Sequence, residues 1–159
     1  MRPKVRPMTD KDKPAVIQML RDIPEFKSAE IDVAEEVINS YLADPIRSGY
    51  HIFVAEASSS IAGYICYGPT PLTEGTWDIY WLAVTPDKQS QGIGKALVNF
   101  ANSNIKEKKG RLTLIETSSK PEYETTRIFY QAQGYEMACR IADFYAPGDD
   151  KLVFQKRLR

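Results

Sequence analysis

The feature of this sequence that most constrains its fold is a long strand-like segment joined by a short loop to a helix start that contains two glycines. Residues 76–84 are rich in aromatic and β-branched side chains, which favours a β-strand. Gly92 and Gly94 follow a short loop, and Leu97 and Ile105 then lie on one face of a helical period. A strand that leads through such a loop into an amphipathic helix predicts a sheet covered by helices.

The loop between this strand and this helix has the properties of an anion site. The first N–H groups of a helix have no intrahelical acceptor, and the helix dipole adds positive potential at the same place. Because Gly92 and Gly94 have no Cβ, phosphate groups can approach the backbone closely. The spacing is not that of a P-loop, and Leu97 stands where the dinucleotide-binding motif needs a small residue. The loop alone is compatible with a pyrophosphate site or with an ordinary turn.

Hydrophobic periodicity and turn residues predict the order of the other elements. A strand at 4–7 precedes a helix capped by Thr9 or Asp12, with Pro14 near its first turn. A second helix from about 31 is followed by strands at 52–57 and 61–67 around a serine turn, and then by the strand 76–84. Next come a helix from Gly94 to about 105, stopped by Gly110, a strand at 112–117 and a helix at 123–133. Two strands at about 135–144 and 152–156, around a turn at 147–150, complete the order.

This order, β-α-α-β-β-β-α-β-α-β-β, predicts an α/β (α+β) fold. We expect a mixed central sheet of about seven strands, flanked on both faces by about four helices. The sequence contains no repeat, no low-complexity tract and no interdomain linker. We therefore expect a single domain over residues 1–159, a length sufficient for one apolar core.

Charge and hydropathy exclude several classes of protein. Lysine plus arginine and aspartate plus glutamate each number 21, so the formal net charge is +0. A neutral chain lacks the basic surface that attracts nucleic acids or anionic membranes. No apolar run approaches the roughly 20 residues that span a bilayer, and residues 1–6 lack the apolar stretch of a signal peptide. We therefore expect a cytoplasmic protein with no nucleic-acid or membrane partner.

Cysteine and histidine are too few for metal or triad chemistry. Cys66 and Cys139 are far apart and form no CxxC pattern, which favours two reduced and mostly buried thiols. His51 is the only histidine, and no serine or cysteine lies in a nucleophile elbow. We expect no metal site and no histidine-based triad. Any chemistry should rest on carboxylates, tyrosine and backbone dipoles.

Three stretches of the chain together resemble the GNAT superfamily of acetyl-CoA-dependent N-acetyltransferases. The loop matches the family signature Gln/Arg-x-x-Gly-x-Gly/Ala, preceded by a strand ending in Ala-Val-x-Pro, in the run Gln89-Ser90-Gln91-Gly92-Ile93-Gly94. Residues 4–10 resemble the family's opening strand and helix cap, and residues 128–135 resemble its late Phe-Tyr-x-x-x-Gly-Phe motif. The resemblance covers essentially the whole chain, in the family's order, and is closest to stand-alone bacterial-type members.

The resemblance implies that the chain binds acetyl-CoA. In the family, the strand before the glycine loop splays from its neighbour, and its free backbone groups pair with the pantetheine arm, which here implies Leu82, Ala83 and Val84. The pyrophosphate would lie on the backbone amides of Gln89, Ser90, Gln91, Gly92, Ile93, Gly94 and Lys95. Many members carry Asn and Ala before the Phe-Tyr pair. Tyr123 and Thr126 occupy those positions here. The asparagine usually contacts the cofactor arm, and Tyr123 or Thr126 would replace that contact.

The resemblance also implies direct transfer of the acetyl group to an amine acceptor. A tyrosine on the late helix commonly gives the leaving thiolate its proton, and it maps onto Tyr130. A backbone N–H near Leu82 would stabilise the oxyanion. The attacking amine must also lose a proton to a base, and the sequence offers carboxylates for that role.

Asp78 is the first candidate for the base. Alternation with a period of two puts four residues of the strand on one face, namely Asp78, Tyr80, Leu82 and Val84. In some branches of the family a carboxylate at this place acts as the base, often through a water molecule. Glu116, which ends the next strand, and Glu74, in the preceding loop, are the alternatives. Asp78 is equally compatible with a solvated charge at a strand end, and for Glu116 and Glu74 that interpretation is favoured.

The sequence does not determine the acceptor. Selection in this fold is expected from the loop between the first two helices and from the closing hairpin. The first region carries five acidic residues that would attract cationic amines or remain solvated helix charges, namely Glu25, Glu30, Asp32, Glu35 and Glu36. Polyamines, aminoglycosides and lysine side chains are candidate acceptors. Family members are often dimers, so a homodimer remains open.

Three other interpretations remain open at the level of sequence. A non-catalytic acyl-CoA-binding or regulatory domain of the same fold would keep the glycine loop but would not need Tyr130 or a base. A nucleotide-binding protein unrelated to CoA would bind ATP. A purely structural or interaction domain would bind no small molecule.

Overall fold

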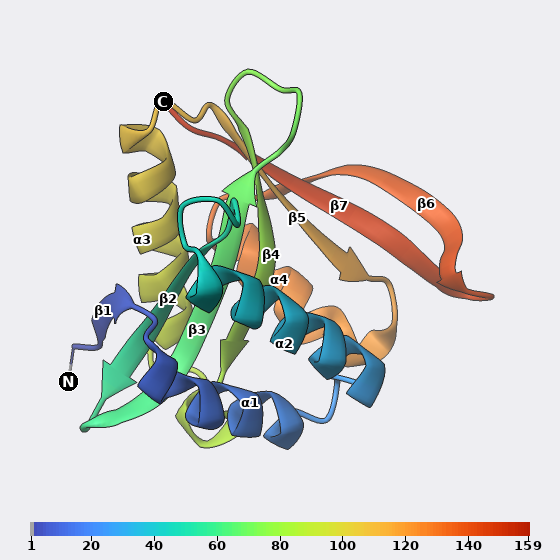
Figure 1. Cartoon of the computed structure of the whole chain (residues 1–159). Coiled ribbons are helices and arrows are strands. Elements are labelled where there is room, and N and C mark those ends of the chain that lie inside the picture. Colours follow the sequence, from blue (N-terminus) through green and yellow to red (C-terminus); the bar gives the residue numbers. More distant parts are fainter. Residues whose placement is uncertain (1) are drawn as a thin grey trace.

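The computed structural model describes residues 2–159 and contains one sheet of seven strands in the order β1-β2-β3-β4-β5-β7-β6 (Figure 1). Neighbouring strands are antiparallel except for β4 and β5, which are parallel. The strands are β1 (Lys4–Pro7), β2 (His51–Ala57), β3 (Ser60–Pro69), β4 (Thr76–Val84), β5 (Leu112–Ser118), β6 (Glu136–Ala146) and β7 (Asp149–Arg157). The predicted order of elements is confirmed.

Four α-helices cover the two faces of this sheet. α1 (Lys13–Asp22) and α2 (Ser28–Ala43) pack on one face, which we call the α1–α2 face. α3 (Ile93–Glu107) and α4 (Glu124–Ala132) pack on the other, the α3–α4 face. Short 3₁₀ turns precede α1, α3 and α4 at Asp10–Asp12, Pro86–Lys88 and Pro121–Tyr123. The predicted α/β (α+β) class is confirmed.

Each face of the sheet has its own apolar core. The core on the α3–α4 face includes Ile65, Tyr67, Leu97, Ile105 and Phe154. The core on the α1–α2 face includes Val16, Leu20, Ile38, Ile52 and Tyr64. Full burial of one such side chain contributes roughly 1.5–3 kcal/mol, so the central strands are held from both sides. Within the described residues, no helix is long and apolar enough to cross a membrane.

The two cysteines differ in their burial. Cys66 on β3 is buried, as predicted, whereas Cys139 on β6 is exposed. β6 is an edge strand of the sheet, and its residues are exposed along its whole length. The prediction of a mostly buried thiol is therefore wrong for Cys139.

The end of α3 differs from its prediction. Lys109, with φ of +66°, takes the left-handed conformation that follows the helix, and Gly110 comes one residue later. Gly110 is required for space instead. A Cβ at this position would lie 2.2 Å from Cγ2 of Ile105 and 2.9 Å from Cδ1 of Trp77. The glycine therefore allows the chain to enter β5 beneath these two side chains.

A β-bulge interrupts β4 at Tyr80. Tyr67 of β3 is opposite Ile79, whereas Cys66 of β3 is opposite Trp81, so Tyr80 is an extra residue without a partner on β3. A bulge of this kind reverses the alternation of side chains between the two faces of a strand.

The bulge contradicts the face predicted for β4. Ile79 packs into the core of the α3–α4 face before the bulge, and Leu82 and Val84 pack into the same core after it. Asp78 and Tyr80 lie on the other side of the strand. The prediction that Asp78 and Tyr80 share a face with Leu82 and Val84 is therefore wrong, because it assumed that the alternation of side chains continues unbroken along β4.

β4 and β5 are paired over only the first part of each strand. Their parallel register runs from Thr76 opposite Leu112 to Ile79 opposite Ile115, and then the strands diverge (Figure 1). β4 continues against β3 as far as Val84, and β5 continues against β7. Residues 80–84 therefore have no strand on the β5 side. We call this unpaired stretch the β4–β5 opening.

Candidate functional site

The β4–β5 opening leaves backbone groups of β4 without strand partners. Residues 80–84 pair with β3 alone, so their N–H and C=O groups that point toward β5 form no sheet hydrogen bond. Leu82, Ala83 and Val84, where backbone contacts to a cofactor arm are predicted, all lie in this stretch. Such groups can pair with an extended polar chain as they would with a strand.

Three polar side chains gather on the α1–α2 face where the two strands separate. Ile79 and Ile115 form the last paired position, so Tyr80 and Glu116 are the first residues beyond it. Asp78 lies two residues before Tyr80 on the same face. Burial, followed by the charge of Asp78 and to a lesser degree that of Glu116, raises the pKa of Tyr80 to about 12. The Tyr80 hydroxyl therefore stays protonated between two carboxylates.

The three candidate bases differ in their surroundings. Asp78 is half-buried, and its Oδ2 accepts a hydrogen bond of 2.6 Å from Oγ1 of Thr70. Glu116 is exposed and forms an ion pair with Nζ of Lys151 at 2.9 Å. Glu74 is exposed in the loop before β4, at the opposite end of the strand from the opening. The structure brings Asp78 and Glu116 together and leaves Glu74 apart.

The glycine loop presents free backbone N–H groups at the start of α3. Gly92 is the N-cap residue, with φ of +83°, and no side chain caps the helix. The first helical bond joins the N–H of Ala96 to the carbonyl of Gly92, so the amides of residues 93–95 have no helical acceptor. Ser90 also has a positive φ, of +65°. Left-handed residues near a helix start are the backbone pattern of anion-binding nests.

The two glycines of the loop serve different purposes. No atom lies within 4 Å of the position that a Cβ of Gly92 would occupy, so the space beside this residue is open. A Cβ on Gly94 would lie 3.1 Å from Cζ of Phe129 on α4. Gly94 therefore lets α4 approach the start of α3, while Gly92 provides the left-handed turn.

Side chains of the loop anchor it to the core and to the segment that precedes it. Ile93 is buried in the core, and Lys95 points to solvent. Nε2 of Gln89 donates to the carbonyl of Val84 at 3.3 Å, and Nε2 of Gln91 donates to a carbonyl of the preceding 3₁₀ turn at 3.4 Å. The two glutamines therefore tie the loop to the segment that enters it.

Tyr130, the predicted acid, lies on the buried side of α4. Its side chain is 7% exposed, and its ring centroid is 6.2 Å from those of Tyr135 and Phe154. Burial raises the pKa of the Tyr130 hydroxyl well above its ordinary value, so the proton is retained. Across residues 2–159 no side chain or backbone group forms a hydrogen bond with this hydroxyl. Its proton is therefore not committed to another protein group.

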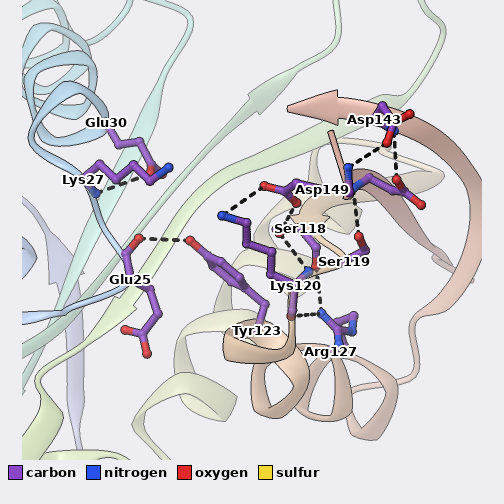
Figure 2. A network of polar contacts seen from close by, with 12 residues as sticks. Glu25, Lys27, Glu30, Ser118, Ser119, Lys120, Tyr123, Arg127, Asp143 and Asp149 are labelled. Carbon is purple, nitrogen blue, oxygen red and sulfur yellow. Dashed lines mark hydrogen bonds and ion pairs between the residues drawn. The ribbon is translucent and has the colours of Figure 1, made fainter. Parts of the chain in front are cut away.

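Tyr123 and Thr126 stand at the start of α4. Thr126 is half-buried. The hydroxyl of Tyr123 donates a hydrogen bond of 3.0 Å to the backbone carbonyl of Glu25, which lies between α1 and α2 (Figure 2). The pKa of Tyr123 is raised to about 12, first by burial and then by the charges of Glu30 and Glu25. Of the other predicted acidic residues, Glu35 is paired with a lysine of α1.

The segment between β5 and α4 is tied to the β6–β7 hairpin. Oγ of Ser118 donates to the carboxylate of Asp149, and Nη1 of Arg127 donates to the carbonyls of Ser118 and Lys120 at 2.8 and 2.9 Å (Figure 2). Residues 149 and 150, predicted to lie in a turn, are instead the buried first residues of β7. Asp149 accepts the bond from Ser118, and the N–H of Asp150 donates to Oγ of Ser119 at 2.8 Å. Both residues therefore pack against the end of β5 through contacts that the local sequence does not reveal.

The hairpin also brings two exposed aromatic residues to the α1–α2 face. β6 loses its regular pairing with β7 between Ile141 and Ala146. Phe144 and Tyr145 lie in this irregular stretch, and Nζ of Lys151 is 4.4 Å from the Phe144 ring centroid. Burial raises the pKa of Tyr145, as do nearby carboxylates that include Glu116. Tyr145 and Lys151 are site residues that the sequence patterns did not single out, because the irregular pairing of β6 and β7 brings them to this face. Alternation predicts Tyr80 beside Asp78, and the structure keeps these two residues on one face.

The sequence of residues 48–137 matches the family described as the acetyltransferase (GNAT) domain. No functionally curated protein matches the chain. Among solved structures, a GNAT-family protein from Desulfovibrio desulfuricans is 35% identical and superposes with a TM-score of 0.95, over 99% of this chain and 100% of that chain.

Two more distant structures share the fold. The ribosomal-protein-S18-alanine N-acetyltransferase of Escherichia coli is 16% identical, with a TM-score of 0.78 over 99% of this chain and 94% of that chain. An aminoglycoside 6′-N-acetyltransferase, solved in complex with coenzyme A, is 17% identical, with a TM-score of 0.76 over 98% and 97%. The family match spans the glycine loop and the opening described above. The chain therefore belongs to the GNAT family of acetyltransferases.

Proposed function

We propose that this protein transfers an acetyl group from acetyl-CoA to a primary amine by direct attack within a ternary complex. The observation that carries the proposal is the continuity of two surfaces, because the unpaired backbone of β4 leads directly into the glycine loop. Coenzyme A carries an amide-bearing arm next to a pyrophosphate. A free strand edge fits the arm, and free helix-start amides fit the pyrophosphate.

The residues at the two surfaces suit these contacts. Backbone groups of Leu82, Ala83 and Val84 would bind the arm, because they have a strand on one side only. The amides of residues 89–95 would bind the pyrophosphate, since the space beside Gly92 is open. Thr126 of α4 would contact the arm from the other side of the opening. When bound, acetyl-CoA supplies the thioester carbonyl that the amine attacks.

Asp78 is our proposed base. It lies on the α1–α2 face at the separation of the strands, and its only hydrogen-bond partner in the described chain is a neutral hydroxyl, that of Thr70. Glu116, by contrast, is already paired with the ammonium group of Lys151. An acceptor amine on this face would pass its proton to Asp78, directly or through water, as its nitrogen forms the new bond to carbon.

The same opening supports the two other requirements of acyl transfer. An unpaired N–H of β4 near Leu82 would donate to the oxyanion that develops on the carbonyl oxygen. As the carbon–sulfur bond breaks, the Tyr130 hydroxyl would donate its proton to the leaving sulfur. That hydroxyl has retained its proton and has no competing acceptor within residues 2–159.

The first test is thermal unfolding with acetyl-CoA, coenzyme A and ATP added separately. A ligand at about 100 times its Kd stabilises the fold by about 2.7 kcal/mol. We expect both CoA species, and not ATP, to raise Tm. Release of free thiol is then measured with a panel of primary amines. Binding of CoA without thiol release for any amine would favour a non-catalytic acyl-CoA-binding domain, and no binding would contradict the proposal.

A further inference from the structure

The connector between α1 and α2, residues 23–27, touches both sides of the β4–β5 opening through two consecutive residues. The ring of Phe26 meets the ring of Trp81 on β4 edge-on, with centroids 6.0 Å apart. The preceding residue, Glu25, accepts the hydrogen bond from Tyr123, which follows β5 (Figure 2). The connector therefore crosses the α1–α2 face of the opening, which is the face that carries Asp78 and Glu116.

The segment that carries Tyr123 is fixed by several polar contacts, whereas the connector has few. The hydroxyl of Ser118 donates to Asp149 of the hairpin and accepts a bond from the N–H of Lys120, while Arg127 of α4 donates to the carbonyls of Ser118 and Lys120. The connector is held across the opening by a single polar contact. For the described residues, the Tyr123–Glu25 bond is the one hydrogen bond between the two N-terminal helices with their connector and the chain after β5.

The chemistry of Tyr123 suits a bond that closes and reopens. Its acceptor is a backbone carbonyl, so the contact is neutral and partly exposed to water. A pKa of about 12 keeps the hydroxyl protonated, and therefore a donor, throughout the neutral range. Loops held by few contacts are the elements that open first in a folded protein, and such loops commonly gate active sites.

The carboxylates around the Tyr123–Glu25 bond favour a particular class of acetyl acceptor. Glu25, Glu30 and Asp149 all act on Tyr123, and Glu30 and Asp149 act also on Tyr145 across the same face. Negative charges at the margin of an entrance favour the approach of cationic amines. The connector then limits which of these amines can pass.

We propose that Tyr123 is a specificity-determining residue, whose hydrogen bond to the Glu25 carbonyl closes the acceptor side of the opening to bulky amines and admits slender cationic ones. This inference rests on the proposed function. It assigns Tyr123 to acceptor selection, in place of the cofactor contact made at this position by the asparagine of many family members.

The test compares wild type with Tyr123→Phe, which removes the donor and keeps the ring. We expect hydrogen–deuterium exchange of the amides in residues 25–27 to become about 5-fold faster, which corresponds to about 1 kcal/mol. With acetyl-CoA as donor, the ratio of kcat/KM for a bulky amine (an aminoglycoside or a tripeptide N-terminus) to that for a linear diamine should rise by a similar factor.

Two control variants separate the hydrogen bond from other effects. Glu25→Ala removes the carboxylate but keeps the carbonyl that accepts the bond, so the exchange of the connector amides should match wild type. Tyr145→Phe removes a nearby hydroxyl that forms no hydrogen bond with any residue described, and it should also leave connector exchange unchanged.

The outcomes are distinguishable from a failure of the proposed function. If wild type acetylates no amine, the proposed function fails, while the exchange measurement still decides whether the connector is held by Tyr123. Unchanged exchange in Tyr123→Phe would overturn the inference. So would faster exchange with an unchanged acceptor ratio. A higher KM for acetyl-CoA with unchanged acceptor preference would assign Tyr123 to the cofactor arm instead.

Discussion

Tyr80 of β4 and Glu116 of β5 are the first residues beyond the last paired position of two parallel strands, and both face the α1–α2 side of the sheet. Their position at the separation of the strands explains why the carboxylates of Asp78 and Glu116 lie near the Tyr80 hydroxyl. Each strand continues against a different partner, so neither side chain is covered by the other strand. The bulge at Tyr80 adds to the separation, as bulges near functional sites commonly do.

Replacement of Tyr130 by phenylalanine tests the proposed acid. We expect kcat to fall by about 100-fold, within the range typical of general acid catalysis. The KM for acetyl-CoA should change little, because the hydroxyl is proposed to act on the departing sulfur. Tm should also remain near that of wild type, since no hydrogen bond within the described protein is lost. An unchanged kcat would contradict the role.

The pH dependence of kcat/KM separates the two carboxylates. Asp78→Asn should lower kcat/KM by about 100-fold and remove the acidic limb of the profile, because a neutral amide cannot accept the amine proton. Glu116→Gln is the matched control, since it removes a charge from the same face and frees Lys151. It should retain the acidic limb. Loss of the limb in Glu116→Gln alone would transfer the role to Glu116.

Gly92 can be tested against a second glycine in the same conformation. Gly92 and Gly148 have φ of +83° and +81°, and at both residues the space within 4 Å of the position that a Cβ would occupy is open. Alanine at either position should destabilise the fold by about 1 kcal/mol, from left-handed strain alone. Only Gly92→Ala should also raise the Kd for CoA, measured by calorimetry. Equal effects of the two variants on CoA binding would argue against the loop as the pyrophosphate site.

The Arg6–Asp12 pair predicts how stability depends on pH. Its hydrogen bond from Arg6 lowers the pKa of Asp12 from 3.8 to about 2. A carboxyl whose pKa is lower in the folded state contributes stability above about pH 4, and that contribution is lost as pH falls toward 2. We expect about 2 kcal/mol from this pair, because the Asp12 side chain is only 8% exposed.

Urea unfolding at pH 7, 4 and 2.5 measures this contribution. Asp12→Asn should be less stable than wild type at pH 7, and the difference should shrink as the pH falls. Asp44→Asn is the control, because the Asp44 side chain is exposed and its ion pair with Arg47 is long, at 3.8 Å. The bond of 3.1 Å that its Oδ1 accepts from the Arg47 amide can be kept by the amide oxygen of an asparagine. A difference between wild type and Asp12→Asn that stays constant over this range would show that ionisation of Asp12 is not linked to folding.

Much of the fold could be predicted from the sequence because its signals are local. The bounds predicted for β4 and for β1 match those in the structure. For β4 the signal is a run of aromatic and β-branched residues, which needs no distant partner. For β1 it is the short segment that ends at Pro7 just before the helix cap. The glycine loop before α3 was likewise predictable, because two glycines placed just before an amphipathic helix form a local pattern. The family resemblance rests on these same local motifs.

The composition of the site depended on contacts that no local pattern contains. The bulge at Tyr80 arises from the register of β4 against β3, and it placed Leu82 and Val84 on the face opposite to Asp78. The bond between Tyr123 and Glu25 joins residues 98 positions apart in the chain. The sequence by itself therefore determined the elements, their order and the glycine loop. Only the tertiary structure decided which side chains meet at the opening, because strand register and long-range contacts form only when the whole sheet is packed.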